Sequence, residues 1–208
     1  TQAAILSFHP VKHICCGEGG AILTNDEELA DRIIHLRSHG ISRPNKTASS
    51  ERPWFYEQDK LGWNYRLTDI QCSLGLSQLE RLDQFLERRR KLAVRYSQIL
   101  LDRPFSDFFS VPQDDPGNAW HLYILRFHMS GIRDQAHLFL KEHGIHTQIH
   151  YVPIYRHPYY EQLFGKIRLP GAESFYESCL SIPLFPKMTD AEQDRVIQTL
   201  ADFVVKIQ

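Results

Sequence analysis

The sequence predicts an α/β protein, and three patterns support that prediction. Residues 3–8 and 21–24 are apolar and suit two buried strands, because the run GEGG between them supplies a turn. Helical patterns with recognisable caps follow at several places along the chain. Residues 120–127, WHLYILRF, alternate as a strand does. The second half is therefore expected to form a compact α+β unit of roughly domain size.

Residues 26–40 are expected to form the first helix. Asp26 occupies the N-cap position, carboxylates lie in the first turn, and Gly40 follows basic residues in the last turn. Residues 41–60 follow neither the helical nor the strand period. We therefore expect a long loop there, polar at first and then aromatic, and long loops in compact domains are often functional.

The remaining elements are indicated by caps and apolar stripes. Thr68 begins one helix, and the last helix, 188–207, starts with a Thr-Asp cap before a clean apolar stripe. The other expected elements are helices at 85–101, 132–144 and 170–182, a strand at 145–151 and an aromatic loop at 152–164.

The composition is that of an ordinary globular protein. Of 208 residues, 42% are hydrophobic, and 24 basic residues nearly balance 25 acidic ones. The charges form no basic stripe that would suit a nucleic-acid backbone. The longest apolar runs are far shorter than the roughly 20 residues that cross a bilayer. We therefore expect neither a nucleic-acid nor a membrane partner.

The cysteines indicate a reducing compartment. Cys15, Cys16, Cys72 and Cys179 fit neither a disulfide framework nor a zinc site. No charged and then apolar leader opens the chain, so a cytoplasmic location is expected.

Three histidines lie close together in EHGIHTQIHY, which raises the question of a metal site. Positions 146 and 150 of a strand would share a face but lie roughly 13 Å apart. That separation is too large for one zinc ion. No metal site is expected.

Lys12 lies between a proline turn and the glycine-rich turn in SFHPVKHICCGEGG. One interpretation is a surface lysine at a turn. The other starts from its neighbours: Ser7 ends the preceding strand, and three glycines follow within a few positions. A hydroxyl, an amine and a permissive backbone would accommodate a phosphate-bearing cofactor. Partial burial or a nearby cation would free the lone pair of such an amine for imine chemistry.

Three separated blocks resemble the sugar-nucleotide aminotransferases of the DegT/DnrJ/EryC family. The blocks are SFHPVKHICCGEGGAILTND, PWFYEQDKLGWNYRLTDIQCSLGLSQLERL and IHTQIHYVPIYRHPYY, and the resemblance covers essentially the whole chain. The segment PWFYEQ and the pairing of HPVK with GEGG resemble the branch that makes a pseudaminic acid precursor in bacteria. The resemblance implies the aspartate-aminotransferase fold, also called PLP-dependent fold type I.

The resemblance also implies roles for four residues. Lys12 would hold pyridoxal 5′-phosphate covalently and carry a proton during transamination, and Ser7 would hydrogen-bond the cofactor phosphate. Asn64 matches an asparagine that reaches the cofactor phosphate of a neighbouring subunit, which implies a homodimer with shared active sites. Arg66, on the same segment, would assist with anionic groups. Without the resemblance, these last two would form a helix-entry turn with a left-handed asparagine and an exposed arginine.

Four further residues match substrate contacts. His150 and Tyr151 match an HYxP segment near the sugar nucleotide, and Tyr56 and Glu57 of the aromatic loop match contacts of the branch. The alternative for Tyr56 and Glu57 is plain packing of an aromatic hinge. Family members often carry a second histidine where this chain has Tyr155, so no role is expected there. The implied partners are a UDP-sugar and an amino-acid donor, expected to be glutamate. The amino group would move to C4 of a UDP-linked 4-keto-6-deoxy sugar.

Other interpretations stay open. The chain would equally suit another sugar-nucleotide aminotransferase of the family, whereas Lys12 argues against the family's dehydratases, which carry histidine there. A truncated, non-catalytic chain is the third interpretation. No segment matches the aromatic residue that stacks on the cofactor ring or the aspartate that pairs with its pyridinium nitrogen. We therefore expect a fragment of a longer enzyme that alone binds the cofactor weakly or not at all.

The resemblance divides the chain into three parts. Residues 1–66 would end the large PLP-binding domain, residues 67–110 would be connecting helices, and residues 111–208 would be a small C-terminal α+β domain. Ligand sites often lie at domain interfaces, and the active site is expected at one.

Overall fold

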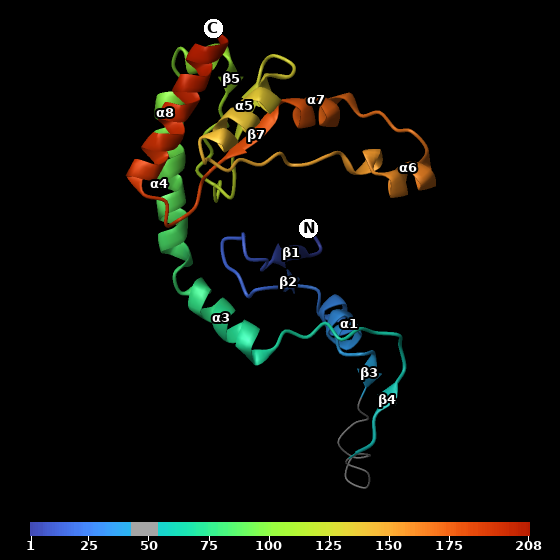
Figure 1. Cartoon of the computed structure of the whole chain (residues 1–208). Helices are drawn as coiled ribbons and strands as arrows, with labels where there is room; N and C mark the ends of the chain where they lie inside the picture. The colour runs from blue at the N-terminus through green and yellow to red at the C-terminus, as the bar shows by residue number, and fades with distance from the viewer. Residues whose placement is uncertain (43–53) are drawn as a thin grey trace. The chain divides into compact units, whose positions relative to one another are not determined.

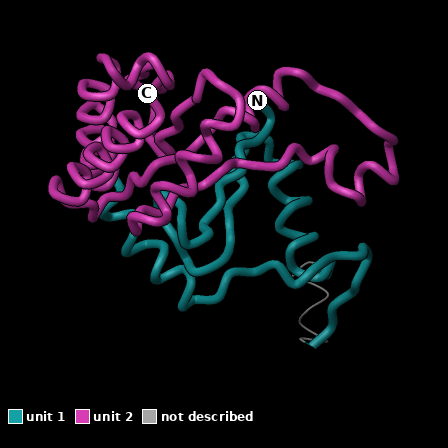
Figure 2. The backbone as a smooth tube through the Cα atoms, turned by 45° about the horizontal axis from the view of Figure 1, so that its top comes forward, with its two compact units in different colours: residues 1–82 teal, residues 83–208 magenta. Residues whose placement is uncertain are grey.

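The computed structural model describes residues 1–42 and 54–208. Residues 43–53, which belong to the loop predicted at 41–60, lie outside the described residues. The chain divides into two compact units, Thr1–Leu82 and Asp83–Gln208, which are described separately here (Figure 2). The domain boundaries predicted at residues 66 and 110 stay a prediction.

Unit 1 opens with an antiparallel strand pair (Figure 1). The register runs from Ala4 opposite Leu23 to Ser7 opposite Gly20, so the residues between the two strands form one closed loop. Asp26 caps the first helix as predicted, because its side chain accepts a hydrogen bond from the Leu29 backbone N–H. The elements are β1 (Ala4–Ser7), β2 (Gly20–Leu23), α1 (Glu27–Arg37), β3 (Ile41–Ser42), β4 (Glu57–Gln58) and α3 (Asp69–Leu79).

Strands β1 and β2 exist where they were predicted, but their predicted burial is wrong. The segment 41–60 was predicted as a loop, yet its two ends hold the short strands β3 and β4, which pair with each other. All four residues of β1 are exposed, and Ile5 retains 82% of its accessible surface. In the described part of unit 1, Cys16 is the one buried apolar side chain. A two-stranded sheet has no second layer of its own, so its apolar side chains stay open unless another layer covers them.

Unit 2 is built on a three-stranded antiparallel sheet in the order β5-β6-β7 (Figure 1). The chain enters it through α4, whose apolar stripe buries Leu92, Tyr96 and Leu100. Its strands are β5 (Phe109–Ser110), β6 (Tyr123–Phe127) and β7 (Cys179–Ile182). Its helices are α4 (Leu82–Leu100), η1 (Phe105–Asp107), α5 (Ile132–Glu142), η2 (Ile154–Arg156), α6 (Pro158–Phe164), α7 (Pro170–Ser178) and α8 (Asp190–Ile207).

The core of unit 2 joins these helices to the central strand. Tyr96 of α4 and Tyr123 of β6 are fully buried, with ring centroids 5.0 Å apart. The Tyr123 hydroxyl is 2.8 Å from the Ser97 Oγ, and burial raises the pKa of Tyr123 to about 12. α4 and α8 lie side by side, and the buried Gln193 amide donates to the Leu92 carbonyl at 2.8 Å.

A buried arginine ties three segments of unit 2 together. The Arg89 Nη1 donates to the backbone carbonyls of Trp120, His121 and Leu184 at 3.0, 3.1 and 3.0 Å. Desolvation lowers the pKa of Arg89, and the three carbonyl dipoles replace part of the lost hydration. Because Tyr123 of β6 pairs with Ile182 of β7, this contact fixes the segments before β6 and after β7, at one end of the sheet, to α4.

Two predicted elements in unit 2 are wrong in part. The predicted strand at 145–151 makes only one antiparallel bridge, between Gln148 and Ser181. The predicted helix 170–182 ends at Ser178, and Cys179–Ile182 instead form the buried strand β7. A short apolar run fits either period, and pairing with β6 decides between them. The predicted loop 152–164 also contains η2 and α6.

No helix in the described ranges is both long enough and apolar enough to span a membrane.

The capping box at the start of α8 gives a stability prediction. The Thr189 Oγ1 accepts from the Glu192 N–H at 3.2 Å, and the Glu192 carboxylate accepts from the Thr189 N–H at 2.7 Å. Thr189→Ala should lower the free energy of unfolding by about 1 kcal/mol, because the Glu192 N–H loses its hydroxyl acceptor and the Glu192 carboxylate loses the hydroxyl that donates to it. Denaturant unfolding followed by circular dichroism measures the change.

The matched control is Gln198→Ala, an exposed position on the same helix, which should shift the midpoint far less. Equal shifts for the two variants would contradict a role for the capping box.

Candidate functional site

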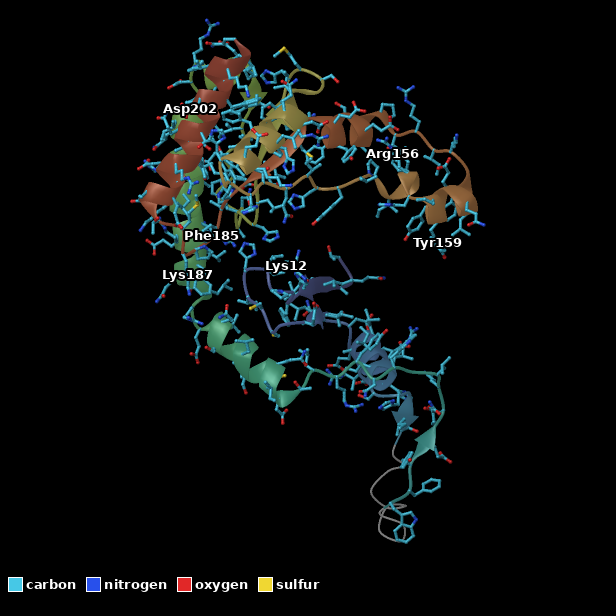
Figure 3. The ribbon with its side chains drawn as sticks, in the orientation of Figure 1. Lys12, Arg156, Tyr159, Phe185, Lys187 and Asp202 are labelled. Atoms are coloured by element: carbon cyan, nitrogen blue, oxygen red, sulfur yellow. The ribbon has the colours of Figure 1, made fainter. Side chains whose placement is uncertain are left out.

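The loop between β1 and β2 carries Lys12, and two backbone hydrogen bonds from Phe8 close it. The Phe8 N–H donates to the Gly19 carbonyl and the Phe8 carbonyl accepts from the Cys16 N–H, both at 2.9 Å. Inside this closure the Lys12 N–H donates to the His9 carbonyl at 2.9 Å, forming the expected proline turn. Lys12 is half-buried on this loop, which we call the lysine loop (residues 8–20; Figure 3).

Glycine is required at three positions of the lysine loop, for two different physical reasons. Gly17 and Gly19 have φ angles of +84° and +137°, which side chains other than glycine rarely adopt. Gly20 allows close strand pairing, since a Cβ there would lie 2.5 Å from the Leu6 carbonyl oxygen. The GEGG run therefore serves the return of the chain from Lys12 into β2.

Ser7 lies at the last position of β1, directly before the lysine loop. It is exposed, it pairs with Gly20, and its Oγ accepts a hydrogen bond from the His9 N–H at 3.5 Å. The structure thus brings Ser7 and Lys12 onto one closed loop, as their spacing predicted. A hydroxyl, a primary amine and a glycine turn are together suited to hold a small aldehyde that carries an anionic group.

The first turns of α3 pack against the lysine loop. The Gln71 side-chain amide donates to the Glu18 carbonyl at 3.0 Å, and the Leu67 side chain lies beside Gly19. The same Gln71 completes the capping box of α3 with Thr68. Gln71 was not among the predicted site residues, although the capping pattern TDIQ marks it as the third residue of a helix.

Asn64 and Arg66 lie on the extended segment before α3. Asn64 forms an isolated antiparallel bridge with Ser38, and the flanking residues bond to the end of α1: the Trp63 and Tyr65 N–H groups donate to α1 carbonyls at 2.7 and 2.9 Å. Among the described residues other than glycine, only His39 and Trp120 have positive φ, so the left-handed turn offered as the alternative for Asn64 is wrong. Both Asn64 and Arg66 are exposed.

Tyr56 and Glu57 lie at and just before β4. Glu57 pairs with Ser42 of β3, and the Tyr56 ring retains 60% of its accessible surface. The pairing holds Glu57, and Tyr56 directly precedes it. For both residues the choice between a substrate contact and a packed hinge stays a prediction.

His150 and Tyr151 belong to unit 2, next to β7. The His150 Nδ1 lies 2.8 Å from the Ser181 Oγ, and its Nε2 lies 3.1 Å from the Gln148 Oε1. Two backbone bonds between Gln148 and Ser181, at 3.0 and 2.8 Å, hold these partners in register. The Tyr151 ring meets the imidazole edge-on, with centroids 4.6 Å apart, and 71% of Tyr151 is exposed.

These contacts assign different tasks to His150 and Tyr151. An amide oxygen only accepts, so the Gln148 Oε1 beside Nε2 predicts the tautomer with the proton on Nε2 and the Ser181 hydroxyl donating to Nδ1. The imidazole is thereby oriented by the protein, and Tyr151 is the member of the pair that projects outward. Ser181 and Gln148 hold the His150 imidazole, and the sequence did not reveal this contact, because Ser181 lay in a segment predicted as helix.

The neighbouring histidines do not assemble a metal site. The His143 Nδ1 lies 2.8 Å from the Phe139 carbonyl oxygen within its own helix end. Within the described residues, no group of three or more metal-ligating side chains gathers.

The match to known proteins now decides the family. Residues 1–201 match the DegT/DnrJ/EryC1/StrS aminotransferase family. The chain belongs to this family. The resemblance predicted from three blocks of sequence is confirmed, and so is the α/β fold class.

Two curated relatives in this family match almost the whole chain. The spore coat polysaccharide biosynthesis protein SpsC of Bacillus subtilis is 38% identical over 212 residues, which cover 98% of this chain and 54% of SpsC. The UDP-4-amino-4,6-dideoxy-N-acetyl-beta-L-altrosamine transaminase of Campylobacter jejuni is 37% identical over 207 residues, which cover 99% of this chain and 53% of that enzyme. The chain thus spans about half the length of the curated relatives it matches.

Solved structures of the family share the fold. PseC of Helicobacter pylori, an aminotransferase involved in the biosynthesis of pseudoaminic acid, has a TM-score of 0.89 at 30% identity, covering 99% of this chain and 54% of PseC. The sugar aminotransferase Spr1654 of Streptococcus pneumoniae in its PLP form has a TM-score of 0.87 at 27% identity, covering 100% of this chain and 53% of Spr1654.

The contacts of His150 predict a measurable tautomer. In long-range ¹H–¹⁵N spectra at mildly alkaline pH, His150 should be protonated on Nε2, because Gln148 Oε1 accepts there. His143 is an internal control with the opposite tautomer, since its Nδ1 faces a carbonyl oxygen and should carry the proton. Ser181→Ala should change the His150 signals and leave those of His143 in place.

An Nδ1-protonated His150 would contradict the assignment, and with it the division of tasks between the imidazole and Tyr151.

Proposed function

We propose that this chain is part of a pyridoxal-phosphate-dependent aminotransferase that transfers an amino group to C4 of a UDP-linked 4-keto-6-deoxy sugar, with glutamate as donor. The observation that carries the proposal is a half-buried lysine on a closed glycine loop, in a chain that matches an aminotransferase family over residues 1–201. The whole protein would act in the synthesis of a pseudaminic-acid-type sugar.

The residues of the lysine loop fit the cofactor. Lys12 offers a primary amine for the aldehyde group, and the exposed Ser7 hydroxyl lies at the mouth of the same loop for the phosphate. Spr1654, a member of the same fold, was solved in PLP and PMP forms. When bound, pyridoxal phosphate supplies the electron sink for the carbanion of the amino donor.

The chain's own residues would supply positioning and proton transfer. Lys12 would hold the cofactor through its side-chain amine and would move a proton at the donor's α-carbon. Asn64 and Arg66 are exposed and would reach anionic oxygens across a homodimer. Tyr56 and Glu57 on the β4 hairpin, and Tyr151 oriented by His150, are the proposed contacts with the UDP-sugar.

The substrate assignment rests on two similar proteins whose names state the kind of reaction. PseC and the Campylobacter transaminase are both named for amination in sugar biosynthesis. SpsC is equally similar in sequence and is named for a spore coat polysaccharide, so another sugar nucleotide of the same family is the second candidate. A family dehydratase is disfavoured by the lysine at position 12.

Covalent trapping tests the role of Lys12. The 208-residue chain is mixed with pyridoxal phosphate, reduced with borohydride and digested, and the labelled lysines are mapped by mass spectrometry. Lys12 should be the principal site, at least several-fold above the exposed Lys60, because the reduction captures even a weakly held cofactor. Lys12→Ala should remove that label, and Lys60→Ala should not.

Because the chain alone is expected to bind the cofactor weakly, the same reduction is repeated on the chimera described next, and equal labelling of Lys12 and Lys60 there would contradict the cofactor role.

A chimera tests the substrate. This chain replaces the matching segment of the Campylobacter jejuni transaminase, and amino transfer from glutamate to a UDP-linked 4-keto-6-deoxy sugar is followed by formation of 2-oxoglutarate. The chimera should be active, Lys12→Ala should abolish turnover, and Tyr151→Phe should raise KM more than it lowers kcat.

A folded chimera that labels at Lys12 but accepts only a different sugar nucleotide would refute the substrate while keeping the aminotransferase. Activity that survives Lys12→Ala would refute both.

A further inference from the structure

A group of thiols lies beside the lysine loop and has no part in the proposed reaction. Cys16 lies four residues after Lys12 in the sequence and retains only 5% of its accessible surface. Cys15 is half-buried, Cys72 of α3 is exposed, and both are free, as is Cys179 in unit 2. The question is whether the exposed and the buried thiol are placed to react with each other.

The packing of α3 on the loop brings Cys72 toward Cys16. A Cβ built on Gly75 would lie 2.6 Å from the Cys16 Sγ, so this sulfur sits against α3 at that residue. Cys72 precedes Gly75 by three residues, which puts both on one face of the helix with Cβ positions about 5–6 Å apart. The Cys16 Sγ is therefore within roughly 3–8 Å of the Cys72 Cβ.

A second contact fixes the register of helix and loop. The Gln71 amide donates to the Glu18 carbonyl at 3.0 Å. Gln71 is one residue before Cys72 on α3, and Glu18 is two residues after Cys16 on the loop. A disulfide requires Cβ atoms about 3.8 Å apart. Rotation about the Cα–Cβ bond of the exposed Cys72 carries its Sγ toward the Cys16 Sγ, and a small shift of the loop along α3 brings the two Cβ atoms to that separation without parting the two elements.

The two thiols differ in reactivity, which sets the order of events. Burial raises the pKa of Cys16, and the neighbouring Cys15 and Cys72 raise it further, so the buried sulfur is mostly protonated and shielded at neutral pH. Cys72 is exposed to solvent and to small oxidants. The exposed Cys72 sulfur is thus the first to react, and the buried Cys16 sulfur is placed to attack the mixed disulfide that forms on Cys72.

We propose that Cys16 and Cys72 form a reversible intramolecular disulfide in the presence of a low-molecular-weight disulfide such as oxidised glutathione. The Cys72 thiolate attacks one sulfur of the oxidant, forming a mixed disulfide and releasing one glutathione thiolate. The Cys16 thiol, on losing its proton to solvent, attacks the Cys72 sulfur and releases the second glutathione thiolate. Two cysteines are oxidised and one glutathione disulfide is reduced to two thiols.

The consequence concerns the lysine loop. A bond between Cys16 and Cys72 ties the loop covalently to α3, four residues from Lys12 and beside the glycine turn. The spacing between the loop and the helix then depends on the redox state of the solution. This is a modification site independent of the sugar chosen, and its formation does not require the proposed aminotransferase activity.

The test uses the native 208-residue chain with oxidised glutathione at neutral pH, followed by alkylation of free thiols and non-reducing peptide mapping. The expected result is a linked pair of peptides containing residues 13–32 and 67–81, lost on treatment with dithiothreitol. Cys15→Ser should preserve the link, which identifies Cys16 as the inner partner. Cys72→Ser should abolish it, and Cys179→Ser is the matched control that should leave it unchanged.

Three results would overturn the proposal: Cys72 remaining as a stable mixed disulfide with glutathione, a bond between the adjacent Cys15 and Cys16, or loss of the linked pair in Cys15→Ser. The same reaction in urea should scatter the links over all four cysteines. An identical yield of the Cys16–Cys72 pair in urea and in buffer would show that the fold does not direct it.

Discussion

The closure of the lysine loop by the backbone of Phe8 is the constraint on which the proposed site depends. One residue donates to Gly19 and accepts from Cys16, so the excursion that carries Lys12 is pinned at its base. Such backbone bonds need no particular side chain at position 8, but they require the chain to return close to its start. The glycines make that return possible, since Gly19 adopts a φ of +137° and Gly20 passes against the Leu6 carbonyl.

Features with a local cause were predictable from sequence, and features made by distant pairing were not. Asp26, Thr68 and Thr189 cap helices through their own next turn, and all three were readable as caps or helix starts. Ser7 and Lys12 share a loop because they flank one turn. By contrast, β7 exists because Cys179–Ile182 pair with β6, and the partners of His150 come from that strand. No local pattern separates this apolar run from a helix end.

The two units differ in what stabilises them. Unit 2 buries a continuous core, and its buried Arg89 converts three free carbonyls into hydrogen-bonded ones. In the described part of unit 1 the apolar side chains of β1 and most of those of α3 are exposed, as expected of elements on which no second layer of helices or strands packs. Family relatives are nearly twice as long as this chain, so the proposed activity belongs to a longer assembly of segments than the one described.

The same distinction between local and distant causes bears on substrate choice. The proposed cofactor attachment is built from contiguous residues, because Ser7, Lys12 and the glycine turn belong to one short stretch of chain. Tyr151 depends on an imidazole that Ser181 and Gln148 orient across a strand bridge, and a change at either partner would redirect the ring without touching Lys12. Relatives named for different sugars share 38% and 37% identity with this chain, a difference too small to rank them. The residues around Tyr151, rather than overall similarity, are therefore where sugar selection should be sought.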